Sequence, residues 1–384
     1  MADSTVDTPV TPGGETPPEV DPSAKEARVW QAARGCVRRL SGLPPKTIAE
    51  RLAELAAAPV DLDRRTDQYG NGVVTELEER VAALLGKPAA VFFPTGTQAQ
   101  QVALRCWAER SQSPTVAIHP MSHPLVYERE ALTTLTGLRT LRSTWDPRPP
   151  TAEEIRKLDE PYGTLMLELP LRDPGFLLPT WDELVDVVAA ARARGANVHF
   201  DGARLWETTV HFGQDLSTIA GLADSVYVSF YKTLGGLAGA ALTGPADFVA
   251  AARAWRHRYG GNLFQQFPMA VAALAGLQAV LPQVPSYVEH ARVVAAALAK
   301  LPGARIHPDP PHTHQFQLWL PHPAERLDEA ALALAENAQT WFAYGWHDRT
   351  PTGLAVTEIT VAEPALALAA DDVTDIGQAF LALV

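Results

Sequence analysis

The sequence predicts an α/β protein built on a mainly parallel sheet. Short apolar runs of strand length recur along the chain and alternate with segments of helical periodicity such as Trp181–Arg194. The predicted strands are Val116–His119, Thr164–Leu169, Asn197–Phe200 and Ser225–Ser229. Strands that alternate with helices are typical of a parallel sheet, in which a ligand sits beyond the carboxyl ends of the strands.

Length and composition indicate a protein with a large core. The chain has 384 residues, of which 47% are hydrophobic, and this length favours one large domain and a smaller one. The expected parts are a disordered tail (1–27), an arm with a helix (28–58), a large domain (59–285) and a small C-terminal domain (286–384). The tail is rich in Pro, Thr, Asp and Glu and has few large apolar side chains.

Charge and apolar patterning narrow the class of function. The formal net charge of -12 argues against a nucleic-acid partner, since that surface needs clustered positive charge. No apolar run reaches the length of a membrane span, and no signal peptide is recognisable, so we expect a cytoplasmic protein without a membrane partner. The two cysteines show no disulfide framework, and neither they nor the scattered histidines have metal-ligand spacing, so no metal is expected.

The first ordered elements are predicted from helical spacing and capping. Ile48, Leu52 and Leu55 recur at the spacing of an amphipathic helix, which we expect in an arm that could cap a neighbour's site. A glycine-rich turn that contains Tyr69 follows, and a helix begins after it. Thr75 and Glu78 stand at the spacing of a capping box.

The next segment, AAVFFPTGTQAQ, has the form of a phosphate site. It reads as a strand, a turn over Pro94–Thr97 and a helix from about Gln98. Free backbone amides at the start of a helix bind phosphate, with Gly96 allowing close approach and Thr97 adding a hydroxyl. An ordinary N-capped helix would have the same pattern.

Two later strands end on a carboxylate and an amine. Asn197–Phe200 is followed by Asp201, and the run Ser225–Phe230 leads to Lys232 and a glycine-rich turn. Pyridoxal phosphate (PLP) needs such a pair: a lysine that condenses with its aldehyde, and an acid that keeps its ring nitrogen protonated. A structural ion pair beside a glycine turn is the alternative.

The rest of the chain is predicted to form the end of the large domain and a second α/β unit. Two helices follow Pro245, the second of them strongly apolar, and a linker at Leu281–Ser286 ends this part. The second unit is predicted as helices at Tyr287–Lys300, Asp328–Phe342 and Asp371–Val384, and strands at His314–Leu320 and Leu354–Val361.

Five segments resemble a known family. They are DQYGNGVVTELEERVAALLGK, PTGTQAQ, SHPLVYE, HFDGARLWE and SFYKTLGG, and they lie between about Arg65 and Gly244. In residue identity and in order along the chain they resemble the threonine aldolase and β-eliminating lyase family of PLP enzymes. The resemblance implies fold type I, with a seven-stranded, mainly parallel sheet in the large domain and a small C-terminal α/β domain. The C-terminal unit resembles the family more loosely.

The resemblance also implies roles for individual residues. Lys232 is expected as the Schiff-base lysine and Asp201 as the partner of the pyridine nitrogen. His123 is expected to stack on the cofactor ring and act in proton transfer, while Glu128 matches an acidic residue near a bound water. The other residues expected to bind the cofactor are Gly96, Thr97, Arg204 and Ser229.

The expected substrate contacts include both a match to the family and two departures from it. Arg204 is expected to receive the substrate carboxylate, with an ion pair to Glu207 or Asp201 as the alternative. Leu171 stands where the family has a histidine that contacts the β-hydroxyl, and Leu354 stands where it has an arginine. Arg172 or Arg349 could replace that arginine, and Arg172 and Tyr69 complete the expected substrate-binding set.

The resulting functional hypothesis is a PLP-dependent lyase. It would cleave a β-hydroxy-α-amino acid to glycine and an aldehyde. Alternatives are β-elimination, racemisation or transamination, or a PLP-binding protein without turnover. Because Tyr69, Arg256 and Arg258 resemble segments that reach a partner's phosphate, a homodimer or homotetramer with shared active sites is expected.

Overall fold

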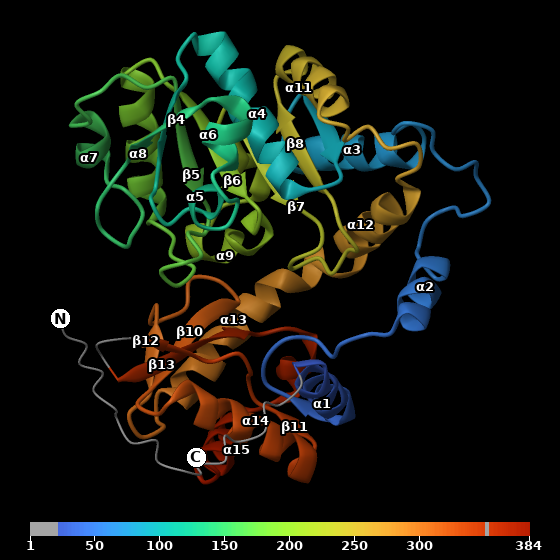
Figure 1. The fold of residues 1–384 in the computed structure, drawn as a ribbon, viewed down its shortest axis with the longest axis vertical. Helices are drawn as coiled ribbons and strands as arrows, with labels where there is room; N and C mark the ends of the chain where they lie inside the picture. Colours follow the sequence, from blue (N-terminus) through green and yellow to red (C-terminus); the bar gives the residue numbers. More distant parts are fainter. Residues whose placement is uncertain (1–21, 350–352) are drawn as a thin grey trace, which may run out of the picture.

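A seven-stranded sheet forms the centre of the large domain. The computed structural model describes residues 22–349 and 353–384 (Figure 1). The strand order is β2-β8-β7-β6-β5-β3-β4, and β8 alone runs antiparallel to its neighbours. The strands are β2 Ala89–Phe93, β3 Thr115–Ile118, β4 Arg139–Arg142, β5 Thr164–Glu168, β6 Asn197–Gly202, β7 Ser225–Ser229 and β8 Ala240–Gly244. The predicted mainly parallel sheet is confirmed.

Helices bury both faces of this sheet, which explains why its strands are apolar without alternation. In β7, Val226 and Val228 belong to one core, whereas Tyr227 belongs to the core on the opposite face. The main helices of the large domain are α3 Val73–Leu84, α4 Gly96–Ser111, α8 Trp181–Ala193, α11 Ala246–Arg258 and α12 Phe267–Ala279. Shorter ones are α5 His123–Val126, α6 Ala131–Thr136, α7 Ala152–Arg156, η1 Leu205–Glu207, α9 Thr209–Phe212 and α10 Leu216–Gly221.

The small domain has its own sheet and core. Its strand order is β12-β13-β10-β9, with every neighbouring pair antiparallel. The strands are β9 Arg305–His307, β10 Gln315–Leu320, β12 His347–Arg349 and β13 Leu354–Thr360. The helices are η2 Leu281–Gln283, α13 Val284–Leu298, α14 Ala324–Ala338, η3 Glu363–Ala367 and α15 Ala370–Leu381.

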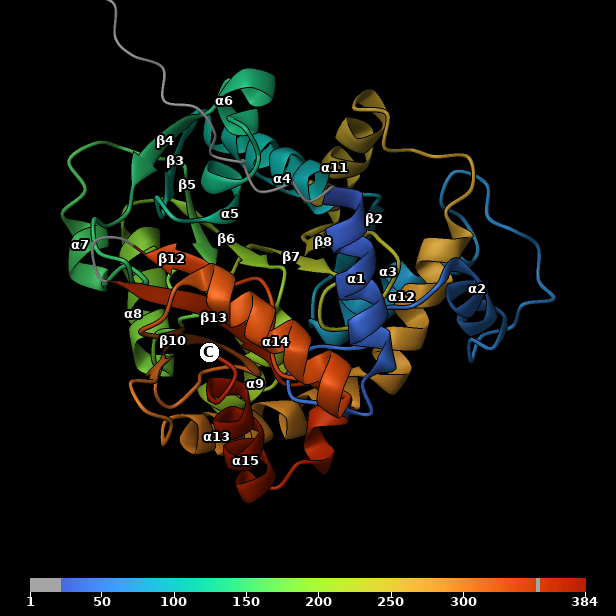
Figure 2. The ribbon, with the colours of Figure 1, turned by 60° about the horizontal axis from the view of Figure 1, so that its bottom comes forward.

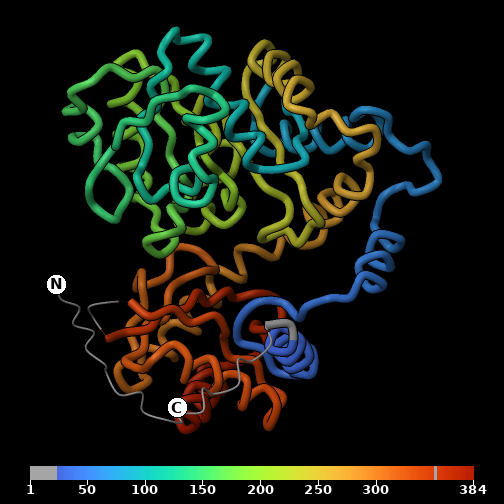
Figure 3. Tube along the Cα trace, in the orientation of Figure 1, coloured from blue at the N-terminus to red at the C-terminus, as the bar shows by residue number. Residues whose placement is uncertain are grey.

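The chain passes between the domains at two places, through the arm near its beginning and through α13 (Figure 3). The predicted linker is instead η2 and the first turn of α13, because Val284 and Val288 pack in a cluster between the domains. The run Phe267–Leu298 is long and apolar enough to cross a membrane, a test that core helices of soluble proteins also pass. Many of its side chains lie in the protein cores.

The first described helix corrects the expected extent of the tail. α1, Pro22–Gly35, includes residues 22–27, for which the composition predicts a disordered tail; the earlier residues lie outside the described part. The helix extends because it packs beside α14, where Arg28 pairs with Glu329 and Glu336 (Figure 2). After it, β1 Arg38–Arg39 pairs with β11 Thr340–Trp341.

Two capping predictions have different outcomes. The predicted amphipathic helix is α2, Ile48–Ala56, and Thr47 forms a capping box with Glu50. The capping box predicted for Thr75 and Glu78 is wrong, because α3 already begins at Val73. The Glu78 carboxylate instead accepts a hydrogen bond from Phe92 N at 2.7 Å and thereby ties α3 to β2.

Candidate active site

A buried carboxylate and an amine meet at the carboxyl edge of the large sheet. Asp201 lies in β6 and is 3% exposed, and Lys232 lies three residues beyond β7. Burial raises the pKa of Asp201, whereas burial and the nearby Arg204 lower the pKa of Lys232. The neutral amine is the form of lysine that condenses with an aldehyde. The structure therefore brings together the two groups that the sequence placed at separate strand ends.

A second buried carboxyl group, Glu168, was missed in the sequence. It ends β5, and its register partner on β6 is Asp201. Its two oxygens accept hydrogen bonds from His123 N at 2.8 Å and Arg172 N at 3.2 Å. Burial and the nearby Asp201 raise the pKa of Glu168 to about 7. The sequence does place an acid near the end of an apolar strand. Because the predicted strand runs from Thr164 to Leu169, Glu168 falls within it and not at its end.

His123 lies at the start of α5 with its ring partly exposed. Its Nδ1 is 3.4 Å from Glu128 Oε1. The other Glu128 oxygen accepts a hydrogen bond from Gln101 Nε2 at 2.9 Å, so α4 holds this buried carboxylate in place. His123 Nε2 has no hydrogen-bond partner in the part of the chain that the structure describes. That ring nitrogen is available to a ligand.

The predicted phosphate turn lies at the beginning of α4. This helix starts at Gly96, earlier than predicted, and Thr95 caps it by accepting a hydrogen bond from Gln98 N. Within the described residues, no acceptor is bonded to the backbone N–H groups of Gly96 and Thr97. A side chain on Gly96 would collide with the Tyr227 hydroxyl. The long helix therefore presents two free amides in a space that admits only glycine.

Ser229 is placed differently from the other predicted phosphate residues. It is buried at the end of β7, and its hydroxyl donates to Ala203 O at 2.7 Å. This bond ties the turn after Asp201 to the strand that leads to Lys232. The Ser229 proton is thus used inside the chain, and its phosphate contact stays a prediction.

Two arginines near the site differ in their pairing. Arg204 forms neither of the ion pairs considered as alternatives, with Glu207 or Asp201, and its buried Nε has no partner among the described residues. Its guanidinium lies 5.3 Å from the centre of the Phe176 ring. Arg172, in contrast, is paired with Glu358 of β13 at 2.9 Å. Arg204 is the arginine that is available to a carboxylate.

The two departures from the family pattern lie in different domains. Leu171 is buried and forms a β-bridge with Leu177. Leu354 begins β13 and lies opposite Arg349 of β12. Neither leucine can supply a hydrogen bond from its side chain. The structure therefore places no polar side chain at these two positions.

Tyr69 lies away from the catalytic groups of its own chain. Its side chain is exposed, its backbone has a positive φ of 53°, and its ring packs edge-on against Phe264. Arg256 is buried and donates to Phe92 O at 2.7 Å, whereas Arg258 is exposed and stacks on Trp255. Tyr69 and Arg258 are thus the exposed members of the segment expected to reach a neighbour.

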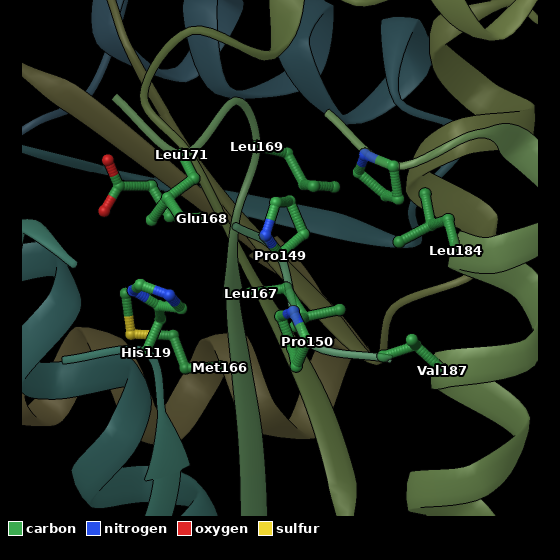
Figure 4. Close-up of a pocket in the computed structure, with 11 residues that line it drawn as sticks. His119, Pro149, Pro150, Met166, Leu167, Glu168, Leu169, Leu171, Leu184 and Val187 are labelled. Atoms are coloured by element: carbon green, nitrogen blue, oxygen red, sulfur yellow. The ribbon is translucent and has the colours of Figure 1, made fainter. Parts of the chain in front are cut away.

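A cavity of about 540 Å³ opens between the two domains beside Lys232. Arg204, Lys232 and Thr233 line it from the large domain, and Tyr287 and His314 line it from the other side. A much smaller apolar cavity of about 20 Å³ lies beneath the strand end of β5. Figure 4 shows the Glu168 carboxylate turned away from Leu184 and Val187, which line that smaller cavity. Of these two cavities, the interdomain cavity has the volume of a small-molecule site.

The residues present fit PLP. Lys232 is a buried amine whose pKa is lowered, Asp201 is a buried acid at the adjacent strand end, and α4 offers free amides where only glycine fits. The orphaned Nε of Arg204 adds an unused buried donor beside them. Together these groups match the aldehyde, the ring nitrogen and the phosphate of this cofactor.

Comparisons with known proteins agree with this site. The sequence profile described as "Beta-eliminating lyase" matches residues 46–319. The low specificity L-threonine aldolase of Escherichia coli (strain K12) is 31% identical over 234 residues, which are 59% of this chain and 68% of that protein.

Solved structures extend the similarity over both domains. A Listeria monocytogenes EGD-E protein provisionally assigned as an L-allo-threonine aldolase has a TM-score of 0.87 and 30% identity, covering 93% of this chain and 99% of its own. An Exiguobacterium sp. 255-15 protein provisionally assigned as an aromatic amino acid β-eliminating lyase/threonine aldolase has a TM-score of 0.86 and 34% identity. It covers 93% of this chain and 100% of its own.

Proposed function

The chain belongs to the β-eliminating lyase family, and we propose that it cleaves the Cα–Cβ bond of a β-hydroxy-α-amino acid to glycine and an aldehyde. It is a PLP-dependent lyase of fold type I. The observation that carries the proposal is that Lys232 and Asp201 lie at one sheet edge, beside Arg204, which forms no ion pair with an acid among the described residues.

Cofactor binding is assigned to residues of the large domain. Lys232 would form the covalent link to the cofactor aldehyde, Asp201 would keep the ring nitrogen protonated, and Gly96 and Thr97 would hold the phosphate through their amides. When bound, PLP supplies an electron sink for the bond that breaks at Cα. His123 would lie against one face of the cofactor ring, and the contact of its Nδ1 with Glu128 fixes the orientation of the imidazole.

Substrate cleavage is assigned to three groups. Arg204 binds the substrate carboxylate with its planar donor pair. His123 Nε2 takes the proton of the β-hydroxyl as the Cα–Cβ bond breaks, and a proton returns to Cα as glycine forms. Glu168 is assigned no contact with the substrate, because its two carboxylate oxygens accept hydrogen bonds from the backbone N–H groups of His123 and Arg172.

One observation favours a second candidate, β-elimination. Leu171 is buried and cannot contact a β-hydroxyl, so the site does not require a hydroxyl at that position. β-Elimination uses the same electron sink and does not need a polar side chain at position 171.

Product analysis separates the two candidates. The purified enzyme with PLP is incubated with a panel of β-hydroxy and β-substituted amino acids. Formation of glycine and an aldehyde in equal amounts supports aldol cleavage. Formation of a 2-oxo acid and ammonia instead supports β-elimination, and turnover of neither group contradicts both.

Oligomeric state and location are further parts of the proposal. We propose a homodimer or homotetramer in which Tyr69 serves a neighbouring site, supported by the exposed side chains of Tyr69, Phe264, Ile48 and Leu52. Light scattering that shows a fully active monomer would reject it. Mixing Lys232→Ala and Tyr69→Phe chains should restore part of the activity if subunits exchange. A cytoplasmic location is proposed as well, and cell fractionation tests it.

A further inference from the structure

A buried ion pair joins the two domains beside the cavity that contains Lys232. Glu207 ends η1 and is fully buried, and His314 lies directly before β10 and is 3% exposed. His314 Nε2 is 3.2 Å from Glu207 Oε1. The same oxygen accepts a hydrogen bond from the Thr233 hydroxyl. One carboxylate therefore connects the small domain with the residue next to Lys232.

The contacts of the His314 ring favour a proton on both of its nitrogens. Its Nδ1 is 2.6 Å from Val361 O, and a carbonyl oxygen can only accept. Its Nε2 lies at ion-pair distance from the Glu207 carboxylate, although within the described residues it makes no hydrogen bond. An imidazolium donates to Val361 O and places its positive charge beside this carboxylate, whereas a neutral ring supplies only the first contact.

The surrounding charges favour the ionised pair. Burial lowers the pKa of His314, but Glu207 outweighs burial and raises it overall, while Arg204 opposes this rise. Burial raises the pKa of Glu207, but His314 and Arg204 outweigh it and lower it overall. The other titratable groups facing the pair are Tyr287 of α13, whose ring lies 6.1 Å from that of His314, and Glu363 of η3, which lines the same cavity.

Glu207 is also linked to the arginine assigned to the substrate carboxylate. The Glu207 N–H donates to Arg204 O at 3.1 Å, so both residues belong to one short helical turn. A shift of the Glu207 side chain would therefore move the base of Arg204. The second Glu207 oxygen has no partner among the described residues, so the contacts to His314 and Thr233 are what hold this carboxylate.

We propose that Glu207 and protonated His314 are positioning residues that hold Arg204 and Lys232 in the geometry that binds the amino acid. This inference rests on the proposed function for its catalytic consequence. The Glu207–His314 pair is a contact between the two domains that depends on the proton of His314. Loss of the His314 proton leaves Glu207 as an unpaired buried charge, and the affinity for the substrate carboxylate falls.

The raised and lowered pKa values give a defined pH window. A histidine with a raised pKa stabilises the fold fully below its unfolded value of about 6.5, and this contribution is lost as the pH rises through the folded value. A carboxyl group with a lowered pKa contributes fully above about 4.5 and loses this contribution as the pH falls through its folded value. The pair therefore stabilises most between about pH 4.5 and 6.5.

The experiment compares five holoenzymes: wild type, His314→Asn, Glu207→Gln, the double variant, and His347→Asn as an exposed control from the same domain. Melting temperature is measured from pH 5 to 9, and the protonation of His314 is followed by NMR with labelled histidine. Steady-state kinetics give KM and kcat over the same range.

We expect His314→Asn to lower the melting temperature at pH 6 by on the order of 5 °C, since it leaves a buried carboxylate unpaired. The double variant should recover part of this loss. Both variants should lack the wild-type decline in stability above pH 6.5. At pH 6, KM should rise about tenfold in His314→Asn with a smaller change in kcat, and His347→Asn should match wild type.

Three results would overturn the inference. They are a His314 signal that stays neutral at pH 6, additive losses in the double variant, or an unchanged KM in a well-folded His314→Asn enzyme. The NMR and wild-type melting data do not depend on activity or on variant folding. If wild type fails to cleave the amino-acid panel while His314 titrates as expected, the proposed function fails and the ion pair stands.

Discussion

The large and small domains contribute to the site in different ways. The large domain supplies Asp201, Glu168 and Lys232 from adjacent strand ends, and the sheet fixes their positions. The small domain reaches this edge through ion pairs, one fully buried at Glu207–His314 and one partly exposed at Arg172–Glu358. The cofactor-binding acid and lysine thus lie at or just beyond the ends of strands in one continuous sheet, while the ion pairs that adjust the geometry lie across a domain boundary.

This difference predicts unequal effects of mutation. Replacing a group on the sheet edge should remove an essential chemical function. Replacing a member of an interdomain pair should change affinity, stability or pH dependence by amounts that follow its burial. The four predictions below test this ordering, beginning with the largest expected effect.

Lys232→Ala should abolish turnover, with a loss of about a thousandfold or more, because no other group in this position can condense with the aldehyde. The visible absorption of the bound cofactor should disappear as well. Lys300→Ala, at an exposed lysine of the small domain, serves as the control. An unchanged visible spectrum in Lys232→Ala would place the covalent link elsewhere and break the comparison at its base.

Gly96→Ala should weaken PLP binding by about ten- to a hundredfold, because the new methyl group meets the Tyr227 hydroxyl at the start of α4. Equilibrium titration of the apoenzyme with PLP measures this. Gly221→Ala is the matched control, since nothing lies within 4 Å of a methyl group added there.

Adding Tyr227→Phe to Gly96→Ala should restore only part of the binding, since the ring carbon that bears the hydroxyl would still crowd the methyl group. Full PLP affinity in the single Gly96→Ala variant would show that the turn is an ordinary capped helix.

Glu168→Gln should change how stability depends on pH. The raised pKa of Glu168, about 7, means that the folded protein binds a proton more tightly than the unfolded chain. The free energy of unfolding of the wild type therefore falls as the pH rises from about 4.5 to 7. Because glutamine does not titrate, the free energy of unfolding of Glu168→Gln should fall by about 2 kcal/mol less over this range. Urea unfolding at pH 5 and pH 8 measures the difference. An identical pH dependence in both proteins would contradict a shared burial of Glu168 and Asp201.

Sequence reasoning recovered the parts of the site that depend on local pattern. Asp201 and Lys232 follow apolar strands directly, and the turn at Gly96 carries its own helix start. Glu168 was missed because its importance comes from a neighbouring strand, and strand order is not written in a local pattern. Likewise, no local pattern distinguishes His314 from the other scattered histidines, although it is buried and pairs with Glu207, over a hundred positions away.

The smallest effect is expected from the Arg172–Glu358 pair, which tests whether burial decides the strength of an interdomain contact. Both side chains are about one third exposed, so solvent screens their attraction. Arg172→Gln should lower the free energy of unfolding by less than about 1 kcal/mol, and added salt should remove the difference. KM should change only a few-fold, because Arg172 is already paired with Glu358 and Arg204 receives the substrate carboxylate.

Urea unfolding and kinetics of Arg172→Gln and Glu358→Gln, each at low and high salt, measure both effects. A KM increase as large as that of Arg204→Gln would show that Arg172 leaves Glu358 to bind the substrate, and the two ion pairs would then have exchanged roles.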